Sequence, residues 1–293
     1  MNKRITFFSF VCILLSSLMS ACSDDSTENP LANGETITLS SSSVVGNGNI
    51  LSSSGTSDGA LESSDSVYVV SIKTCKTDLI DTCKYETLTD NRDGQTYKTV
   101  KIGYQVWMAE NLRFKTDNSV CFKDSIEDCS KYGRYYSWAD AMDSAGVYSI
   151  NGEGCGYHFT TCSPIYPVRG ICPEGWHLPQ PSEWDELFRV VGGNRVLMAT
   201  NGWLAHSDSI DSGNGTDFYG FSVTPSGLWF TRFSDVGYEA YFWTSGRLNE
   251  NTAAAAQIFI GNEQRDPRVD YYRLRYRYSL SSPFAIPVRC VKD

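Results

Sequence analysis

The sequence has few residues of the kinds that form closely spaced metal sites. Its three histidines stand far apart, at His158, His177 and His206, and none of its ten cysteines forms a Cys-x-x-Cys pair. Structural zinc sites need ligands at such short spacings. The sequence therefore gives little support to a zinc site.

Positive charge is also scarce. The chain has 25 basic and 34 acidic residues, and removal of the first 21 residues takes Lys3 and Arg4 away, leaving 23 basic residues and a net charge of −11. Nucleic acids and anionic membrane surfaces attract basic proteins. We therefore expect no nucleic-acid partner.

The leading hydrophobic run, ITFFSFVCILLSSLM, follows Lys3 and Arg4 and is too short for a membrane-spanning helix. Residues 1–21 are therefore predicted to be a signal peptide. The junction LMSAC resembles the lipobox of bacterial lipoproteins, with Met19 where leucine is usual, and this implies a lipid on Cys22 that attaches the protein to a membrane. The alternative is an ordinary secreted protein in which Cys22 is incidental.

The segment after the signal has the composition of a tether. Residues 23–66 contain 13 serines and no aromatic residue, too little apolar surface to offset the entropy of ordering. Its first residues, SDDS, are similar to an acidic signal that sends lipoproteins to the cell surface, although flexible tethers often carry such a tract. We expect a disordered tether over 22–66 and a location at the outer membrane or cell surface.

Eight cysteines follow the tether, and an even number in an exported chain indicates disulfides formed in an oxidising compartment. Three pairs lie close in sequence and the last two cysteines then remain for each other. The expected pairs are Cys75–Cys83, Cys121–Cys129, Cys155–Cys162 and Cys172–Cys290. Many other connectivities are open.

All seven tryptophans lie after residue 85, so 86–293 is predicted to be the globular domain. Residues 67–85 lead into it, with a strand, SVYVVSIK at 66–73, and the Cys75–Cys83 loop. Asp93-Gly94 is typical of a type I′ turn, and the alternation that follows over 97–102 predicts a hairpin.

Two helices are predicted from apolar periodicity. In the first, Trp138, Ala141, Met142 and Ala145 share one face and Gly146 ends the helix. The second begins at Pro181, has Glu183 in its first turn, and ends at Gly192-Gly193. Its apolar stripe consists of Trp184, Leu187, Phe188 and Val191.

His177 lies just before the second helix in the stretch CPEGWHLPQPSEWDEL. With no neighbouring histidine and no clear carboxylate partner, it is predicted to be a packed residue whose ring nitrogens bond the backbone. Glu183, Asp185 and Glu186 are candidates for a carboxylate pair in acid–base chemistry. Adjacent acids at a helix start are more often a solvated face, and that is the expectation here.

Six blocks of the sequence together resemble the Fibrobacter succinogenes major paralogous domain, over roughly 86–293. The blocks are LTDNRDGQTYKTVKIGYQVWMAENL, YGRYYSWADAM, CPEGWHLPQPSEWDEL, GTDFYGFSVTPSG, FWTSG and PVRCVKD. This family is common on exported bacterial lipoproteins and largely uncharacterised. The resemblance adds no catalytic residue.

HLPQPSEWDEL also looks like a block of formylglycine-generating and sulfatase-modifying proteins, which implies a C-type-lectin-like α+β fold. In that fold the Cys172–Cys290 bond ties a strand-to-helix junction to the last strand. The late reactive cysteine pair of those oxidases is missing, because only Cys290 lies beyond Cys172. The motifs of calcium-dependent sugar-binding lectins are missing too.

The best candidate for a binding surface is RVDYYRLRYRYSL at 268–280. Alternation along one strand would place Arg273, Arg275 and Arg277 on one face, where they could clamp acidic groups of a polysaccharide. The opposite face would carry Tyr272, Tyr276 and their neighbours, whose rings could stack on sugars. The alternative is a strand with tyrosines packed inward and arginines solvated.

A second candidate is HSDSIDSGNGTDFYG, where oxygen ligands recur every three residues at Asp208, Asp211, Asn214 and Asp217. Such ligands on a flexible loop suit structural calcium, although Asp217 could instead hold a turn. No other cofactor is expected.

The expected function is non-catalytic binding of an extracellular polysaccharide or another surface component. One alternative is a structural surface or assembly protein without a small ligand. A second is an enzyme, either like the formylglycine-generating oxidases or acting on glycans, for which the sequence shows no convergent titratable groups.

Overall fold

The computed structural model describes residues 72–156, 162–205, 213–249, 252–259, 273–274, 278–279 and 284–293, which belong to one unit, Asp65–Asp293. The predicted signal peptide, Cys22, the tether and most of the predicted strand at 66–73 lie outside these residues. The last two residues of that strand, Ile72 and Lys73, are not in a strand. Ile72 instead packs against the core, so this part of the prediction is wrong.

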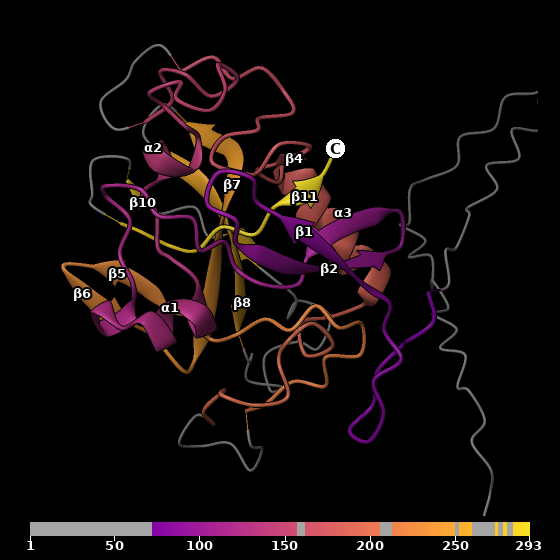
Figure 1. The fold of residues 1–293 in the computed structure, drawn as a ribbon. Helices are drawn as coiled ribbons and strands as arrows, with labels where there is room; N and C mark the ends of the chain where they lie inside the picture. Colours follow the sequence, from indigo (N-terminus) through magenta and orange to yellow (C-terminus); the bar gives the residue numbers. More distant parts are fainter. Residues whose placement is uncertain are drawn as a thin grey trace, which may run out of the picture. The chain divides into compact units, whose positions relative to one another are not determined.

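The described residues form helices and antiparallel strands in a mixed α+β arrangement (Figure 1). The helical elements are η1 (Phe122–Asp124), α1 (Ile126–Tyr132), α2 (Trp138–Ala141) and α3 (Pro181–Val191). The strands are β1 (Tyr85–Thr89), β2 (Thr96–Ile102), β3 (Gln105–Met108), β4 (Trp176–His177), β5 (Leu228–Phe230), β6 (Arg232–Ser234), β7 (Glu239–Asn249), β8 (Thr252–Phe259), β9 (Arg273–Leu274), β10 (Tyr278–Ser279) and β11 (Val291–Lys292). Across these ranges, no helix is long and apolar enough to cross a bilayer.

One sheet joins the two ends of the domain. Its five strands run in the order β1-β2-β3-β11-β4. Val291 of β11 pairs with Trp107 of β3 on one side and with His177 of β4 on the other. The link from β3 to β4 therefore depends on β11.

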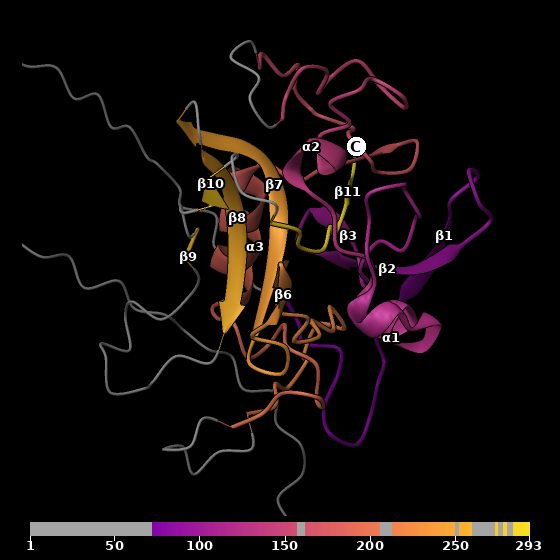
Figure 2. The same ribbon diagram turned by 90° about the vertical axis from the view of Figure 1, so that its left-hand side faces the viewer.

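The β7–β8 hairpin forms a wall with hydrophobic core on both faces (Figure 2). Successive strand residues point to opposite faces. Trp243 and Ala255 belong to one buried cluster, while Phe242 and Ala256 belong to another that also contains the buried face of α3. Small alanines on β8 leave room for the large rings of β7 beside them.

The predicted hairpin after residue 85 is confirmed, but its turn differs from the expected type. Strands β1 and β2 pair from Tyr85 to Thr89, so the loop covers the six residues 90–95. Gly94 has a φ of 74°, whereas Asp93 is not among the residues with positive φ. A type I′ turn needs positive φ at both positions. Here the buried Asp90 accepts hydrogen bonds from Arg92 and organises a longer loop.

The second predicted helix is confirmed as α3. It begins at Pro181, buries its predicted stripe and ends at Gly192 in the left-handed conformation. The first predicted helix is shorter than expected, because Asp143 has a φ of 56°. Its buried carboxylate accepts three backbone N–H groups, from residues 147, 148 and 149, and so replaces further helical turns with a loop. Ala145 is consequently exposed.

All four predicted disulfides are present, namely Cys75–Cys83, Cys121–Cys129, Cys155–Cys162 and Cys172–Cys290. Bonds of this kind persist in oxidising, extracytoplasmic surroundings. Cys172–Cys290 spans 118 residues and is fully buried. The other three close short loops.

Candidate functional site

His177 lies at the junction of β4 and α3, with a carboxylate at each ring nitrogen. Its Nδ1 is 2.7 Å from Asp293 Oδ1, and its Nε2 is 3.0 Å from Glu183 Oε1. Glu183 Oε2 also accepts a hydrogen bond from the backbone N–H of Gln180, which fixes it at the start of α3. The imidazole therefore connects α3 to the residue that follows β11.

The hydrogen-bond partners of this cluster favour the protonated form of the ring. Ionised carboxylates only accept hydrogen bonds, and a neutral imidazole has one N–H to donate. A ring that donates an N–H to ionised carboxylates on both Glu183 and Asp293 must be an imidazolium. Burial by itself lowers the pKa of His177, but hydrogen bonding and charge from Glu183 and then Asp293 outweigh burial and raise that pKa above its usual 6.5.

The expectation that His177 bonds the backbone was wrong. One partner, Glu183, had been assigned to a solvated helix face, and its side chain is turned toward the ring instead. The neighbouring Asp185 is exposed, and Glu186 pairs with Arg189 at 2.7 Å. Asp185 and Glu186 therefore match the expectation of a solvated helix face. Both nitrogens of His177 are occupied, so this ring has no free nitrogen for a general base.

The raised pKa predicts how stability changes with pH. The folded pKa of His177 lies above its unfolded value, so the stabilisation is complete below about pH 6.5 and is lost as pH rises through the folded pKa. We expect His177→Gln to lower the free energy of unfolding by about 1 to 2 kcal/mol near pH 6 and by less at higher pH. Urea denaturation across this range measures the difference.

Glu183→Gln keeps a side chain able to cap α3 and removes the charge that faces the ring, so it should reproduce part of the trend. Glu186→Gln, on the same helix, is the matched control and should leave the pH dependence from pH 6 upward unchanged. A constant difference between wild type and His177→Gln at every pH would contradict the ionic cluster.

Asp217, predicted as a calcium ligand, has a different role. It is 1% exposed, and its Oδ2 lies 2.5 Å from Lys76 Nζ, while its Oδ1 accepts the backbone N–H of Ser222 at 2.6 Å. Both oxygens are thus used to hold a turn and to fasten the Cys75–Cys83 loop. This corrects the calcium interpretation at Asp217.

Of the remaining calcium candidates, Asn214 lies within the described residues. Asn214 Oδ1 accepts the backbone N–H of Trp203 at 3.1 Å, and Asp208 and Asp211 lie outside the described residues. Within the described part of the chain, no group of three or more histidine, cysteine, aspartate or glutamate residues is placed to hold a metal ion.

Within the predicted Arg/Tyr strand, the structure describes two short strands, β9 and β10, which both pair with β8. Arg273 of β9 is opposite Gln257, and Tyr278 of β10 is opposite Ala253. The two registers differ by one residue. The side chains of β9 and the residues Tyr272, Arg275, Tyr276 and Arg277 lie outside the described part of the structure.

The position of one carboxylate partner of His177, Glu183, could have been predicted from the sequence. Glu183 stands at the third position of α3, where a carboxylate caps the helix start and points back toward the preceding residues. Asp293 is 116 residues from His177, and no local pattern connects such positions. Only the pairing of β11 with β4 brings it there.

Comparison with known proteins identifies the family. The model of the Fibrobacter succinogenes major domain matches residues 100–292, which is more than half of the chain. The matched range includes β11, α3, the β7–β8 wall and the Cys172–Cys290 bond. Neither the curated proteins nor the solved structures contain a match. The chain belongs to the Fibrobacter succinogenes major domain family.

Proposed function

We propose that this protein is a lipid-anchored surface lipoprotein whose domain binds an extracellular polysaccharide without converting it. The lipid would be carried by Cys22, and residues 23–66 would hold the domain away from the outer membrane. The domain would have a C-type-lectin-like fold. On this proposal His177 has a structural role, because both of its ring nitrogens face carboxylates.

The observation that carries this proposal is the pairing of β9 and β10 with β8. This segment contains three arginines within five residues, at 273, 275 and 277, in a chain of net charge −9. Its partner β8 is buried on both faces from Ala253 to Ile258. A basic segment along a rigid strand is suited to an extended ligand with repeated carboxylate or sulfate groups, because guanidinium groups bind such oxygens in pairs.

Binding tests this function directly. The full-length protein is titrated with acidic polysaccharides, such as alginate and pectate, and with neutral glucans, by affinity electrophoresis and calorimetry. We expect saturable binding to an acidic polymer, weakened about tenfold or more in an Arg273/Arg275/Arg277→Ala variant, which corresponds to about 1.4 kcal/mol.

A matched control removes three positive charges elsewhere. Lys98, Lys101 and Arg189 are exposed, and their joint replacement by alanine changes the net charge equally. This variant should bind within about twofold of wild type. Equal losses in both variants would show that only overall charge matters. Absence of binding to every polymer, together with concentration-dependent self-association, would favour a structural surface role instead.

A further inference from the structure

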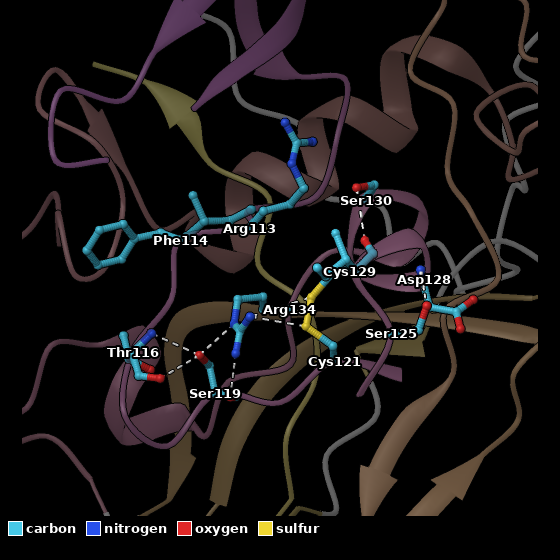
Figure 3. Close-up of a disulfide and its surroundings, with 12 residues drawn as sticks. Arg113, Phe114, Thr116, Ser119, Cys121, Ser125, Asp128, Cys129, Ser130 and Arg134 are labelled. Atoms are coloured by element: carbon cyan, nitrogen blue, oxygen red, sulfur yellow. Dashed lines mark hydrogen bonds between the residues drawn. A yellow bond between two sulfur atoms is a disulfide. The ribbon is translucent and has the colours of Figure 1, made fainter. Parts of the chain in front are cut away.

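The disulfide Cys121–Cys129, here called the α1 disulfide, has a guanidinium group against its sulfur atoms (Figure 3). Arg134 Nη1 is 3.1 Å from Cys121 Sγ and 3.5 Å from Cys129 Sγ. Arg134 Nε donates to Ser119 Oγ at 2.8 Å, and Nη2 donates to the Ser119 carbonyl at 2.9 Å. Ser119 is itself held by the backbone of Thr116. The cation is therefore fixed beside the sulfurs.

No carboxylate pairs with this cation within the described part of the chain, where Arg134 bonds Ser119 and the two sulfurs. Two other arginines do pair with carboxylates, Arg92 with Asp90 at 2.6 Å and Arg189 with Glu186 at 2.7 Å. A neutral disulfide gains little from such a charge, whereas a thiolate gains a strong charge-assisted interaction. The site therefore favours the reduced, ionised state of its sulfurs more than the oxidised one.

The α1 disulfide is also within reach of solvent. Cys129 is half-buried on α1, and the flanking residues Glu127 and Ser130 are exposed. Cys121 is 8% exposed, so Cys129 is the more exposed residue of the pair. The Cys172–Cys290 bond is fully buried by comparison. The α1 disulfide is therefore both partly exposed at Cys129 and next to the positive charge of Arg134.

We infer that the α1 disulfide is a site of thiol–disulfide exchange with low-molecular-weight thiols. The thiolate of the small molecule attacks Cys129 Sγ and forms a mixed disulfide. The bond to Cys121 Sγ breaks, and Cys121 leaves as a thiolate beside Arg134. A second small thiolate attacks the outer sulfur of the mixed disulfide and releases the Cys129 thiolate. Two thiols are thereby oxidised to one disulfide, and the protein disulfide takes up two electrons.

Arg134 accelerates the first step because a leaving thiol of lower pKa departs faster. It also shifts the equilibrium, since each unit by which the thiol pKa falls stabilises the thiolate tenfold. Arginine or lysine neighbours lower cysteine pKa values by about one unit or more. The α1 disulfide should therefore be reduced about tenfold more readily than an equally exposed disulfide without a cation.

The Cys75–Cys83 disulfide provides that comparison within the same molecule. Both bonds have a sequence separation of 8, and Cys75 and Cys83 are each half-buried. The nearby cation, Lys76, is already bound to Asp217 at 2.5 Å and lies 3.7 Å from Asp81. Loop length is matched and Cys75–Cys83 is the more exposed of the two bonds, while the uncompensated cation is present only at the α1 disulfide.

The experiment treats the oxidised full-length protein with reduced glutathione, quenches with an alkylating agent, and quantifies each cysteine by peptide mass spectrometry. We expect the α1 disulfide to be reduced about tenfold faster than Cys75–Cys83. Arg134→Gln should remove this difference in reduction rate, and Arg134→Lys should keep most of it. Once reduced, Cys121 should be alkylated with a half-maximal pH at least about one unit below the usual 8.5.

Equal reduction rates for the two bonds in the wild-type protein would overturn the inference. A faster reduction of the α1 disulfide that persists in Arg134→Gln would also overturn it, because the difference would then not depend on the guanidinium group. If Arg134→Gln does not fold, the pH profile of Cys121 alkylation in the wild type decides: a normal thiol pKa overturns the proposal, and a lowered one supports it.

Discussion

Replacing Cys172 and Cys290 with alanine is expected to lower the free energy of unfolding by about 4 to 5 kcal/mol. The bond closes a loop with a sequence separation of 118, and the entropy that a disulfide removes from the unfolded chain rises with loop length. Both sulfurs are fully buried, so their removal also leaves unfilled core volume. Urea denaturation under non-reducing conditions measures the loss.

The double alanine variant of Cys75 and Cys83 is the control. Its loop separation is only 8, which corresponds to a loss of about 2.5 kcal/mol in the same chain-entropy description. We expect the two variants to differ by about 2 kcal/mol, with both midpoints and denaturant slopes recorded. Similar losses for the two pairs would show that loop length does not govern their stabilising effect.

Arg289→Ala is the second substitution with a large expected effect, a loss of about 3 to 5 kcal/mol. Arg289 is 1% exposed, and its guanidinium donates twice to Asn111 Oδ1, at 2.6 and 3.0 Å, and once to the Phe221 carbonyl. It also stacks on the ring of Phe221 at 4.6 Å and faces Phe242 at 5.2 Å. Truncation leaves these oxygens unpaired around a cavity.

Nearby negative charges help to keep the buried Arg289 protonated. Burial lowers the pKa of Arg289 to about 9, while the charges of Asp217 and Glu110 act in the opposite direction, so the group is still protonated at neutral pH. Arg289→Lys should lose a large part of the stability as well, because an ammonium group cannot reproduce the forked contacts.

Arg189→Ala, which removes an exposed arginine paired with Glu186, should change stability by less than about 1 kcal/mol. Thermal unfolding of the three variants tests the ranking. A loss of unfolding free energy below about 1 kcal/mol for Arg289→Ala would contradict this prediction. It would mean that neighbouring core side chains fill the space left by the guanidinium group.

The parts of the fold that follow from local chemistry could be predicted from the sequence. Helix α3 has an apolar stripe, a proline at its start and glycine after its end, and these signals agree with one another. The disulfides could be predicted because three pairs lie close in sequence and two cysteines are left over. None of these predictions needed knowledge of distant contacts.

The predictions that were wrong depend on contacts that no local pattern contains. Helix α2 stops early because Asp143 binds three backbone N–H groups in the following loop. Asp217 is an ion-pair partner because Lys76 reaches it from 141 residues away. His177 meets Asp293 only through the sheet. When a polar side chain has several possible partners, the tertiary structure determines which of them it binds.

The central position of β11 also has a consequence for the order of assembly. A chain synthesised only as far as residue 280 contains β3 and β4, yet it lacks the strand that joins them. Cys172 likewise has no partner until Cys290 appears. The five-stranded sheet and its long-range disulfide are therefore completed only after almost the whole domain has been synthesised.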